Sequence, residues 1–306
     1  MPQHYPRDMV GYADEPVHPK WPNNAKIALQ FVLNYEEGAE NCILHGDAAS
    51  ETFLSEMNNP QAFTGQRHLT MESLYEYGAR VGVWRILELF KSYGIPLTVF
   101  AVAMALQRNP KVAEYLAAHD YDICSHGYRW INYQEISRAI EEEHFYKSIE
   151  ILTALTGKRP LGWYTGRDSI HTRELVLQEG GFLYDSDAYN DDLPYFVDGL
   201  NAKKHLVIPY TMDNNDMRFV FGGFTYSEQF YNYLKDSFDT LYFEGQTRPK
   251  MMSIGMHCRV LGRPGKIMAM KRFLDYVSGF DDVWFCSRLD IAKHWHTHFG
   301  TTEITL

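Results

Sequence analysis

Residues 26–38 read KIALQFVLNYEEG, and this stretch decides the fold class. A short apolar run that stops at a polar, glycine-containing turn is typical of a buried strand followed by a loop. Two glutamates, Glu36 and Glu37, stand where the strand ends. The same arrangement, an apolar run with a polar end, recurs along the rest of the chain.

Further apolar runs predict strands, and amphipathic stretches between them predict helices. Strands are expected at 97–103, 121–125, 161–164, 182–184, 206–209, 251–256 and 283–285. Helices are expected near 74–87, 110–119, 134–155, 171–179, 226–243, 263–279 and 288–298, the fifth opening with a Thr225–Glu228 capping box. Strands that alternate with helices indicate parallel βα units. The predicted fold is α/β, a distorted (β/α) barrel of about seven parallel strands.

The chain is expected to form one catalytic barrel domain over residues 25–299. Residues 1–24 carry five prolines and predict an extended N-terminal arm, and residues 300–306 predict a C-terminal tail. No long linker or internal repeat suggests a second domain, and a single barrel commonly takes about 250 residues.

Composition narrows the classes of function. The chain has 306 residues, of which 45% are hydrophobic and 22% charged, as in an ordinary globular protein. Its 29 Lys and Arg against 39 Asp and Glu give a net charge of −10, which argues against binding nucleic acid or an anionic membrane. The beginning of the sequence lacks the apolar stretch of a secretory signal, and the four cysteines show no paired spacing. We expect a soluble cytoplasmic enzyme with free thiols and a small-molecule substrate.

Reactive side chains stand at the expected strand ends, where a βα barrel carries its chemistry. Each has a plainer alternative. Glu36 and Glu37 form either a catalytic pair or a solvated turn, and His126 and His257 are either catalytic or core histidines. Arg167 is either a site residue or a salt-bridge partner. The strand ends also hold many of the aromatic residues, which make up 15% of the chain.

Five of these stretches carry a resemblance to a known family. They are LNYEEG (33–38), SHGYRW (125–130), GWYTGR (162–167), YDSDAYNDDLPY (184–195) and MRF (217–219). Read in order, they resemble the polysaccharide deacetylase superfamily and, within it, the metal-independent allantoinases of purine catabolism. The resemblance runs from about residue 5 to 297. It implies a distorted barrel that opens the hydantoin ring of allantoin to give allantoate, often as a homotetramer.

The superfamily pattern includes an Asp-Asp pair, a His-x-x-x-His metal pair and a late general-acid histidine. Here Glu36 and Glu37 take the place of the Asp pair, and His126 takes that of the first metal histidine. Trp130 replaces the second histidine, and His257 matches the late one. Tyr164 stands where the third motif has its arginine, with Arg167 three residues later. Because a zinc site needs three well-placed protein ligands, we expect neither a metal nor another cofactor.

The resemblance also implies catalytic roles. Glu36 is assigned as the base that activates water, with Glu37 or His126 orienting the water or the substrate. Arg167 or His126 stabilises the oxyanion, and His257 protonates the leaving nitrogen. The two adjacent carboxylates are expected to raise each other's pKa, which would suit a base working near neutral pH. A hydantoin needs less electrophilic help than a plain amide, because its leaving nitrogen lies between two carbonyl groups.

Seven further residues are assigned to substrate binding. Aromatic members would wall a small flat pocket, and polar members would bind the ureido arm of the substrate. They are Tyr35, Trp130, Trp163, Tyr164, Asp185, Asn215 and Asp216.

Three other functions remain open. The first is a metal-dependent N-deacetylase acting on chitin or peptidoglycan, which would need a long open groove and a tightly bound metal. The second is a hydrolase of another cyclic imide or ureide. The third is a catalytically inactive barrel that binds a small metabolite.

Overall fold

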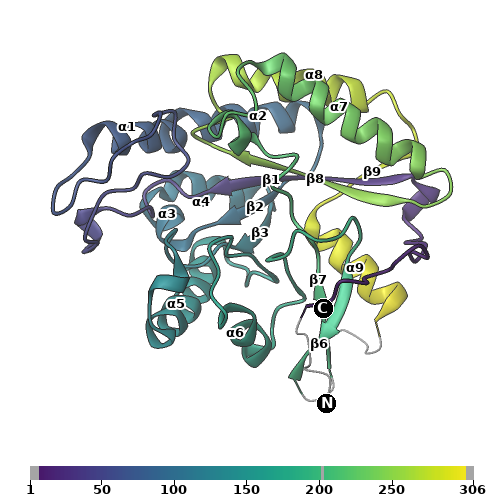
Figure 1. The fold of residues 1–306 in the computed structure, drawn as a ribbon, viewed down its shortest axis with the longest axis horizontal. Helices are drawn as coiled ribbons and strands as arrows, with labels where there is room; N and C mark the ends of the chain where they lie inside the picture. Colours follow the sequence, from purple (N-terminus) through teal and green to yellow (C-terminus); the bar gives the residue numbers. More distant parts are fainter. Residues whose placement is uncertain (1–6, 201–202, 301–306) are drawn as a thin grey trace.

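The run at residues 26–38 forms the strand around which the sheet is built. A computed structural model describes residues 7–200 and 203–300 (Figure 1). Strand β1 (Ile27–Tyr35) is buried along its whole length. One edge pairs with β8 (Lys250–His257), and the other pairs first with β9 (Val283–Phe285) and then with β2 (Thr98–Ala101). A strand with neighbours on both edges and helices on its outer face has no solvent-facing side, which explains its uninterrupted apolar sequence.

The described strands form one curled, nine-stranded sheet. Its order is β6-β7-β5-β4-β3-β2-β1-β8, and β9 pairs with β1 outside this path. Every pairing is parallel except that of β6 with β7. The remaining strands are β3 (Asp122–Ser125), β4 (Gly162–Trp163), β5 (Tyr184–Asp185), β6 (Tyr195–Asp198) and β7 (Lys204–Val207). The predicted distorted barrel of parallel βα units is confirmed. On the free edge of β8, a single parallel bridge joins Gly255 to Asn215, which lies outside the named strands.

The helices follow the strands in the expected alternation. They are α1 (Leu69–Tyr77), α2 (Val83–Tyr93), α3 (Ala103–Arg108), α4 (Pro110–Ala118), α5 (Arg138–Thr156), α6 (Thr172–Glu179), α7 (Ser227–Glu244), α8 (Pro264–Val277) and α9 (Arg288–Phe299). Short turns of 3-10 helix lie at Pro22–Asn24, Ile43–His45, Tyr133–Glu135 and Asp216–Phe219.

Several details differ from the sequence prediction. The run at 97–103 is split, because the strand ends at Ala101 and α3 begins at Ala103. The antiparallel edge strand β6 was not predicted, since its half-exposed sequence has no clear apolar run. The cap of α7 uses Gln229 rather than Glu228: the Gln229 side chain accepts a hydrogen bond from the Thr225 backbone N–H at 2.7 Å.

The two faces of the sheet hold separate apolar clusters. Odd-numbered residues of β1 pack under the outer helices (α2, α7 and α8), and its even-numbered residues point into the barrel. Inside the barrel, the buried Arg288 of α9 donates to Gln30, Ser253, Ser186 and the Ile208 and Pro209 carbonyls. These partners lie in or directly after strands β1, β8, β5 and β7, so Arg288 connects strands from different parts of the sheet.

The helix predicted at 74–87 is interrupted by a π-helical turn over Gly78–Gly82. Both glycines lie against the loop that follows β8. A Cβ atom on Gly82 would overlap the Cys258 carbonyl oxygen, and one on Gly78 would overlap the Glu37 carboxylate. The extra residue of a π-turn rotates the helix so that both glycines face the same crowded site, and such turns are frequent at functional sites.

We expect Gly82→Ala to destabilise the protein by about 1–3 kcal/mol or more, because the new methyl group meets backbone rather than a movable side chain. Gly265→Ala is the matched control, since a Cβ atom there has no neighbour within 4 Å. Urea unfolding at neutral pH measures both. Equal unfolding midpoints for the two variants would contradict the close packing at Gly82.

The N-terminal arm and the tail lie partly outside the described residues, at 1–6 and 301–306. Trp21, near the end of the arm, is buried and packs against Trp284 and Trp295, with ring centroids 5.5 and 5.8 Å away. The four cysteines are free and buried. Within the described residues, no helix is long and apolar enough to span a membrane.

Candidate active site

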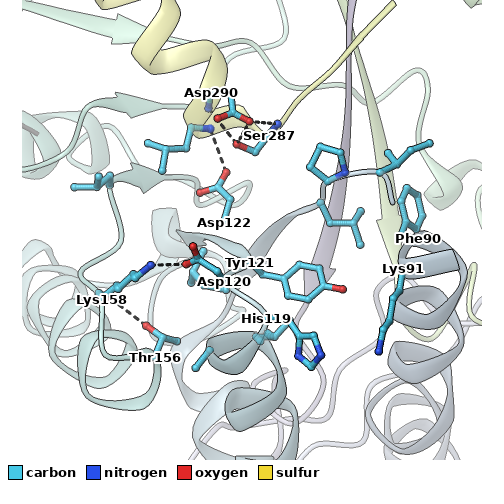
Figure 2. A pocket seen from close by; sticks show the side chains of 18 of the residues that line it. Phe90, Lys91, His119, Asp120, Tyr121, Asp122, Thr156, Lys158, Ser287 and Asp290 are labelled. Carbon is cyan, nitrogen blue, oxygen red and sulfur yellow. Dashed lines mark hydrogen bonds and ion pairs between the residues drawn. The ribbon is translucent and has the colours of Figure 1, made fainter. Parts of the chain in front are cut away.

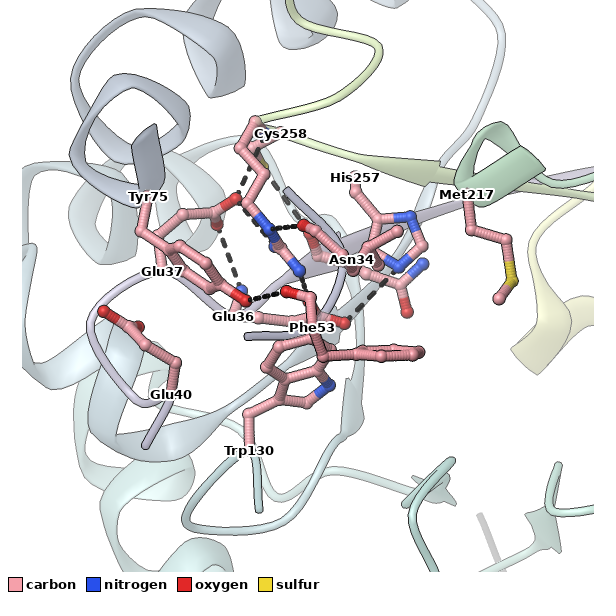
Figure 3. Close-up of polar contacts among 12 residues, drawn as sticks. Asn34, Glu36, Glu37, Glu40, Phe53, Tyr75, Trp130, Met217, His257 and Cys258 are labelled. Atoms are coloured by element: carbon pink, nitrogen blue, oxygen red, sulfur yellow. Dashed lines mark hydrogen bonds and ion pairs between the residues drawn. The ribbon is translucent and has the colours of Figure 1, made fainter. Parts of the chain in front are cut away.

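Three strand ends bring the predicted acid and base groups together. Glu36 directly follows β1, His126 follows β3, and His257 is the last residue of β8. Because these strands run parallel and lie close in the sheet, their carboxyl ends meet at one edge of the barrel. Figure 3 shows Glu36 and His257 pointing toward one another there, above the indole ring of Trp130.

Glu36 lies at the centre of this group and is buried. One carboxylate oxygen, Oε1, is 3.3 Å from His126 Nε2 and 3.5 Å from His257 Nε2. The other, Oε2, accepts a hydrogen bond from Arg259 Nη2 at 2.8 Å. A single carboxylate oxygen therefore faces two imidazole nitrogens.

Glu37 points to the other face of the sheet end. Its Oε2 accepts from the Glu36 backbone N–H at 3.1 Å, and its Oε1 accepts from the Arg259 backbone N–H and Nη1 at 3.1 and 3.2 Å. Consecutive residues of an extended chain point in opposite directions, so only Glu36 can face the barrel interior. Glu37 supports the site from behind.

The two glutamates have opposite pKa shifts. Burial favours the neutral acid in both. For Glu36 this is outweighed by Arg259, His257 and a hydrogen bond from His126, which hold its pKa well below the usual value. Burial and the charge of Glu36 leave the pKa of Glu37 raised despite Arg259. The expectation that both carboxylates would be shifted upward was therefore wrong for Glu36, because two cationic neighbours face it.

His257 is held from behind by Asp216. Its Nδ1 lies 2.6 Å from Asp216 Oδ1, and Asp216 Oδ2 accepts from the backbone N–H groups of His257 and Leu261 at 2.8 and 3.0 Å. Burial lowers the pKa of His257, but Glu36 and Asp216 together raise it to about 9. The imidazole is therefore protonated at neutral pH, with its Nε2–H directed at Glu36.

His126 differs from His257 in having one unused nitrogen. The side chain is buried against the ring of Tyr164, whose centroid is 4.9 Å away. Its Nε2 faces Glu36, while Nδ1 is buried without a hydrogen-bond partner among the described residues. Unpaired buried nitrogens are uncommon in folded proteins, so this atom is a candidate for contact with substrate or water.

Arg259 was given no catalytic or binding role from the sequence. It is buried, contacts both glutamates and also donates from Nε to the Leu54 carbonyl at 2.8 Å. Its place two residues after His257, at the end of β8, was the available signal. The sequence could not show that this guanidinium folds back around the end of β1.

Trp130 and Arg167 lie together beside the acid–base group. The Arg167 guanidinium is 4.0 Å from the Trp130 ring and 4.7 Å from that of Phe53, and it donates to Glu51 and the Trp130 carbonyl at 3.3 Å each. The arginine that touches Glu36 is thus Arg259, and Arg167 is a half-buried residue of the neighbouring loops. Tyr164 stacks on Phe100 inside the barrel.

Several predicted binding residues have other partners. Trp163 packs outside the barrel against Phe145 and Phe182, and Asp185 binds Arg173 and His205 on that same outer face. Alternation along β4 and β5 is the reason, because Tyr164 and Ser186 are the residues that face inward.

Three more predicted residues support the wall rather than line a pocket. Tyr35 is an odd-numbered residue of β1 and lies in the outer core. Asn215 accepts from the Met217 N–H and donates to the Thr211 carbonyl, so its side chain caps a turn, and its backbone bridges to Gly255 of β8. Both carboxylate oxygens of Asp216 are hydrogen-bonded, one to the His257 ring and the other to the backbone N–H groups of His257 and Leu261.

The donor set does not fit the metal ion of the superfamily. Trp130 occupies the place of one ligand, and the two strand-end carboxylates already bind a buried guanidinium. No group of three or more His, Cys, Asp or Glu in the described part of the chain is arranged to hold a metal ion. We therefore derive no step through a metal.

A separate cavity of about 680 Å³ lies at the opposite, amino ends of β2 and β3 (Figure 2). Asp122 lines it, accepting from Thr98 Oγ1 at 2.7 Å and the Leu289 N–H at 3.1 Å, and burial raises its pKa to about 6. In barrels this face usually serves stability rather than chemistry.

A buried carboxylate that faces two imidazoles thus lies at the carboxyl ends of a curled parallel sheet, where α/β barrel enzymes carry their acid and base groups. A family model described as polysaccharide deacetylase matches residues 68–177. A Schizosaccharomyces pombe protein named as a polysaccharide deacetylase is 42% identical over 94% of this chain and 96% of its own length. The chain belongs to the polysaccharide deacetylase family.

Two solved structures are more similar still. The crystal structure of PuuE allantoinase is 58% identical, with a TM-score of 0.96 over 98% of this chain and 100% of that one. A Pseudomonas aeruginosa structure, described as a polysaccharide deacetylase, is 59% identical, with a TM-score of 0.94 over 97% of this chain and 100% of that one.

Proposed function

We propose that this protein is an allantoinase, which opens the hydantoin ring of allantoin by hydrolysis to give allantoate. The observation that carries the proposal is one ionised carboxylate oxygen, Glu36 Oε1, placed between His126 and the protonated His257. The 58% identity to a structure named as an allantoinase, over nearly the whole chain, supports the choice of substrate.

In the proposed reaction Glu36 accepts a proton from water as the water oxygen attacks a ring carbonyl. His257 then gives its Nε2 proton to the leaving ring nitrogen, while Asp216 retains the hydrogen bond to Nδ1. The low pKa of Glu36 reflects in part the positive charge of His257. Loss of that charge makes Glu36 a stronger base at the stage when it must hold the proton.

The remaining donors have supporting roles in the proposal. His126 faces the same carboxylate oxygen and is the nearest group that could orient the water or stabilise the oxyanion. Trp130 and Tyr164 supply aromatic surfaces that suit a small flat ring. Arg167, beside Trp130, is the candidate to contact the ureido arm.

Metal independence is part of the proposal, since both carboxylates already bind the Arg259 guanidinium. Assembly as a homotetramer and a cytoplasmic location stay predictions.

A substrate panel tests the proposed function. We expect purified protein to consume allantoin, to act weakly or not at all on unsubstituted hydantoin and a cyclic imide, and to leave an N-acetylglucosamine oligomer unchanged. Prolonged treatment with a strong chelator should leave the rate within about twofold, because no step uses a metal. Preferential consumption of the oligomer would replace the proposal by a deacetylase. Loss of activity on chelation, reversed by zinc, would refute metal independence.

A further inference from the structure

We propose that Arg259 is a positioning residue. Its buried guanidinium keeps Glu36 ionised and correctly oriented, and it holds residues 51–54 in place beside the site. The proposal rests on the proposed function in taking Glu36 as the base. Arg259 is fully buried and makes contacts on every side of its guanidinium, to two carboxylates, a backbone carbonyl and two aromatic rings.

The carboxylate contacts join the two faces of the sheet end. Arg259 Nη2 donates to Glu36 Oε2 at 2.8 Å, and Nη1 donates to Glu37 Oε1 at 3.2 Å. Glu36 points into the barrel and Glu37 away from it. A planar guanidinium offers several donors in fixed directions and can bridge such a pair, whereas a lysine ammonium acts as a single point charge.

Aromatic rings hold the guanidinium in place. Its central carbon lies 4.2 Å from the centroid of Tyr75 and 4.8 Å from that of Trp130. Cation–π contacts strengthen where water is excluded. Trp130, which stands where the superfamily has a metal-binding histidine, thus contacts the cation that this chain places at its carboxylates.

The third set of contacts reaches the segment 51–54. Arg259 Nε donates to the Leu54 carbonyl at 2.8 Å, and the Tyr75 hydroxyl donates to the Phe53 carbonyl at the same distance. Phe53 then packs against Trp130 and the half-exposed Phe221, with ring centroids 5.7 and 5.2 Å away. The same guanidinium therefore contacts both the base and the segment that packs against Trp130.

The charges around Glu36 explain why the guanidinium matters. Glu36 faces His126, His257 and Arg259, with Glu37 and Asp216 one contact further away. Without Arg259, Glu36 would lose the guanidinium charge that, together with His257, lowers its pKa. Opposite charges within about 4–6 Å lower a carboxyl pKa by about 1–3 units, so Glu36 would hold a proton at higher pH.

Chemical rescue tests this inference. We expect Arg259→Ala to lower kcat for allantoin by about 10²–10³-fold and to move the acid limb of the kcat/KM profile up by about 1–3 pH units. Guanidinium chloride at tens of millimolar, far below the molar concentrations that denature proteins, should restore at least a tenth of the lost activity and the original acid limb. Urea, a neutral molecule of nearly the same shape, should restore neither.

Controls separate a positioning role from a structural one. Arg173→Ala, which removes an arginine on the outer face, should show no rate increase with guanidinium. If Arg259→Ala fails to fold, Arg259→Lys takes its place: the retained charge should keep the acid limb near that of the wild type while kcat falls. Equal rescue by urea and guanidinium, or an unshifted acid limb in a folded Arg259→Ala protein, would overturn the inference.

A measurement without substrate separates this inference from the proposed function. The carboxyl carbon of Glu36, assigned in ¹³C NMR spectra by its absence in Glu36→Gln, should titrate at higher pH in Arg259→Ala than in the wild type. Guanidinium should reverse the shift. If wild-type protein leaves allantoin intact but this titration behaves as stated, the proposed substrate fails and the role of Arg259 stands. An unchanged Glu36 titration refutes that role even in an active enzyme.

Discussion

Replacing Glu36 by glutamine should reduce kcat for allantoin by about 10³–10⁴-fold, at the upper end of what a general base contributes. Glutamine keeps the shape of the side chain but cannot accept the proton of the attacking water. It also removes the negative charge that raises the pKa of His257. One substitution therefore removes the base and weakens the interactions that keep the acid protonated, leaving Asp216 as its charged partner.

The measurement is kcat and KM at pH 7, together with circular dichroism and urea unfolding. Glu141→Gln is the matched control, because Glu141 is another buried glutamate, bonded to the hydroxyl groups of Ser169 and Thr172 at 2.5 Å each. We expect that variant to keep wild-type rates. If kcat of the Glu36→Gln enzyme is within tenfold of the wild-type value, the assignment of Glu36 as the base is wrong.

Replacing His257 by asparagine should lower kcat by about 10²–10⁴-fold and abolish the alkaline limb of the pH profile. The pKa of His257 is raised to about 9, so its acid form is present at neutral pH and is lost as the pH rises through 9. The same group contributes stability that is fully present below its unfolded pKa of about 6.5 and is lost as the pH rises from there through about 9. Stability should therefore decline between about pH 6.5 and 9, whereas activity should decline as the pH rises through 9.

Asp216→Asn tests the cause of this raised pKa. Removing the negative charge behind Nδ1 should move the alkaline limb of kcat/KM to lower pH, because asparagine hydrogen-bonds the ring without favouring its charged form. His205→Asn is the control for both changes: His205 also pairs with a carboxylate, Asp185, at 3.0 Å, but on the outer face of the sheet. An alkaline limb unmoved in Asp216→Asn would be incompatible with His257 as the acid.

Much of the fold could be predicted because its signals are local. The buried run of β1 and seven further strands were all expected. Hydrophobic periodicity, and the glycines or prolines that bound each element, can be recognised within a short stretch of chain. The π-turn at Gly78–Gly82 could not be predicted from such signals. The Cys258 carbonyl and the Glu37 carboxylate, far away in sequence, occupy the space that side chains at its two glycines would need.

The candidate site divides in the same way. Glu36, His126 and His257 could be found because a strand end is a local feature and parallel strands bring their ends together. The roles of neighbouring residues could not, because they depend on direction. Trp163 and Asp185 stand at strand ends but face outward, and Asp216 lies behind His257 rather than beside a substrate.

The sequence by itself determined the class of fold, the edge of the barrel where the candidate site lies and the three groups at its centre. Only the tertiary structure decided which of two adjacent glutamates faces inward, why one is strongly acidic and the other is not, and which arginine supplies the positive charge. The physical reason is the distance along the chain over which each effect operates. Hydrophobic periodicity depends on residues close in sequence, whereas Coulomb interactions depend on distance in space. Arg259 and Glu36 are 223 positions apart in the chain, yet Arg259 Nη2 and Glu36 Oε2 lie 2.8 Å apart in the protein.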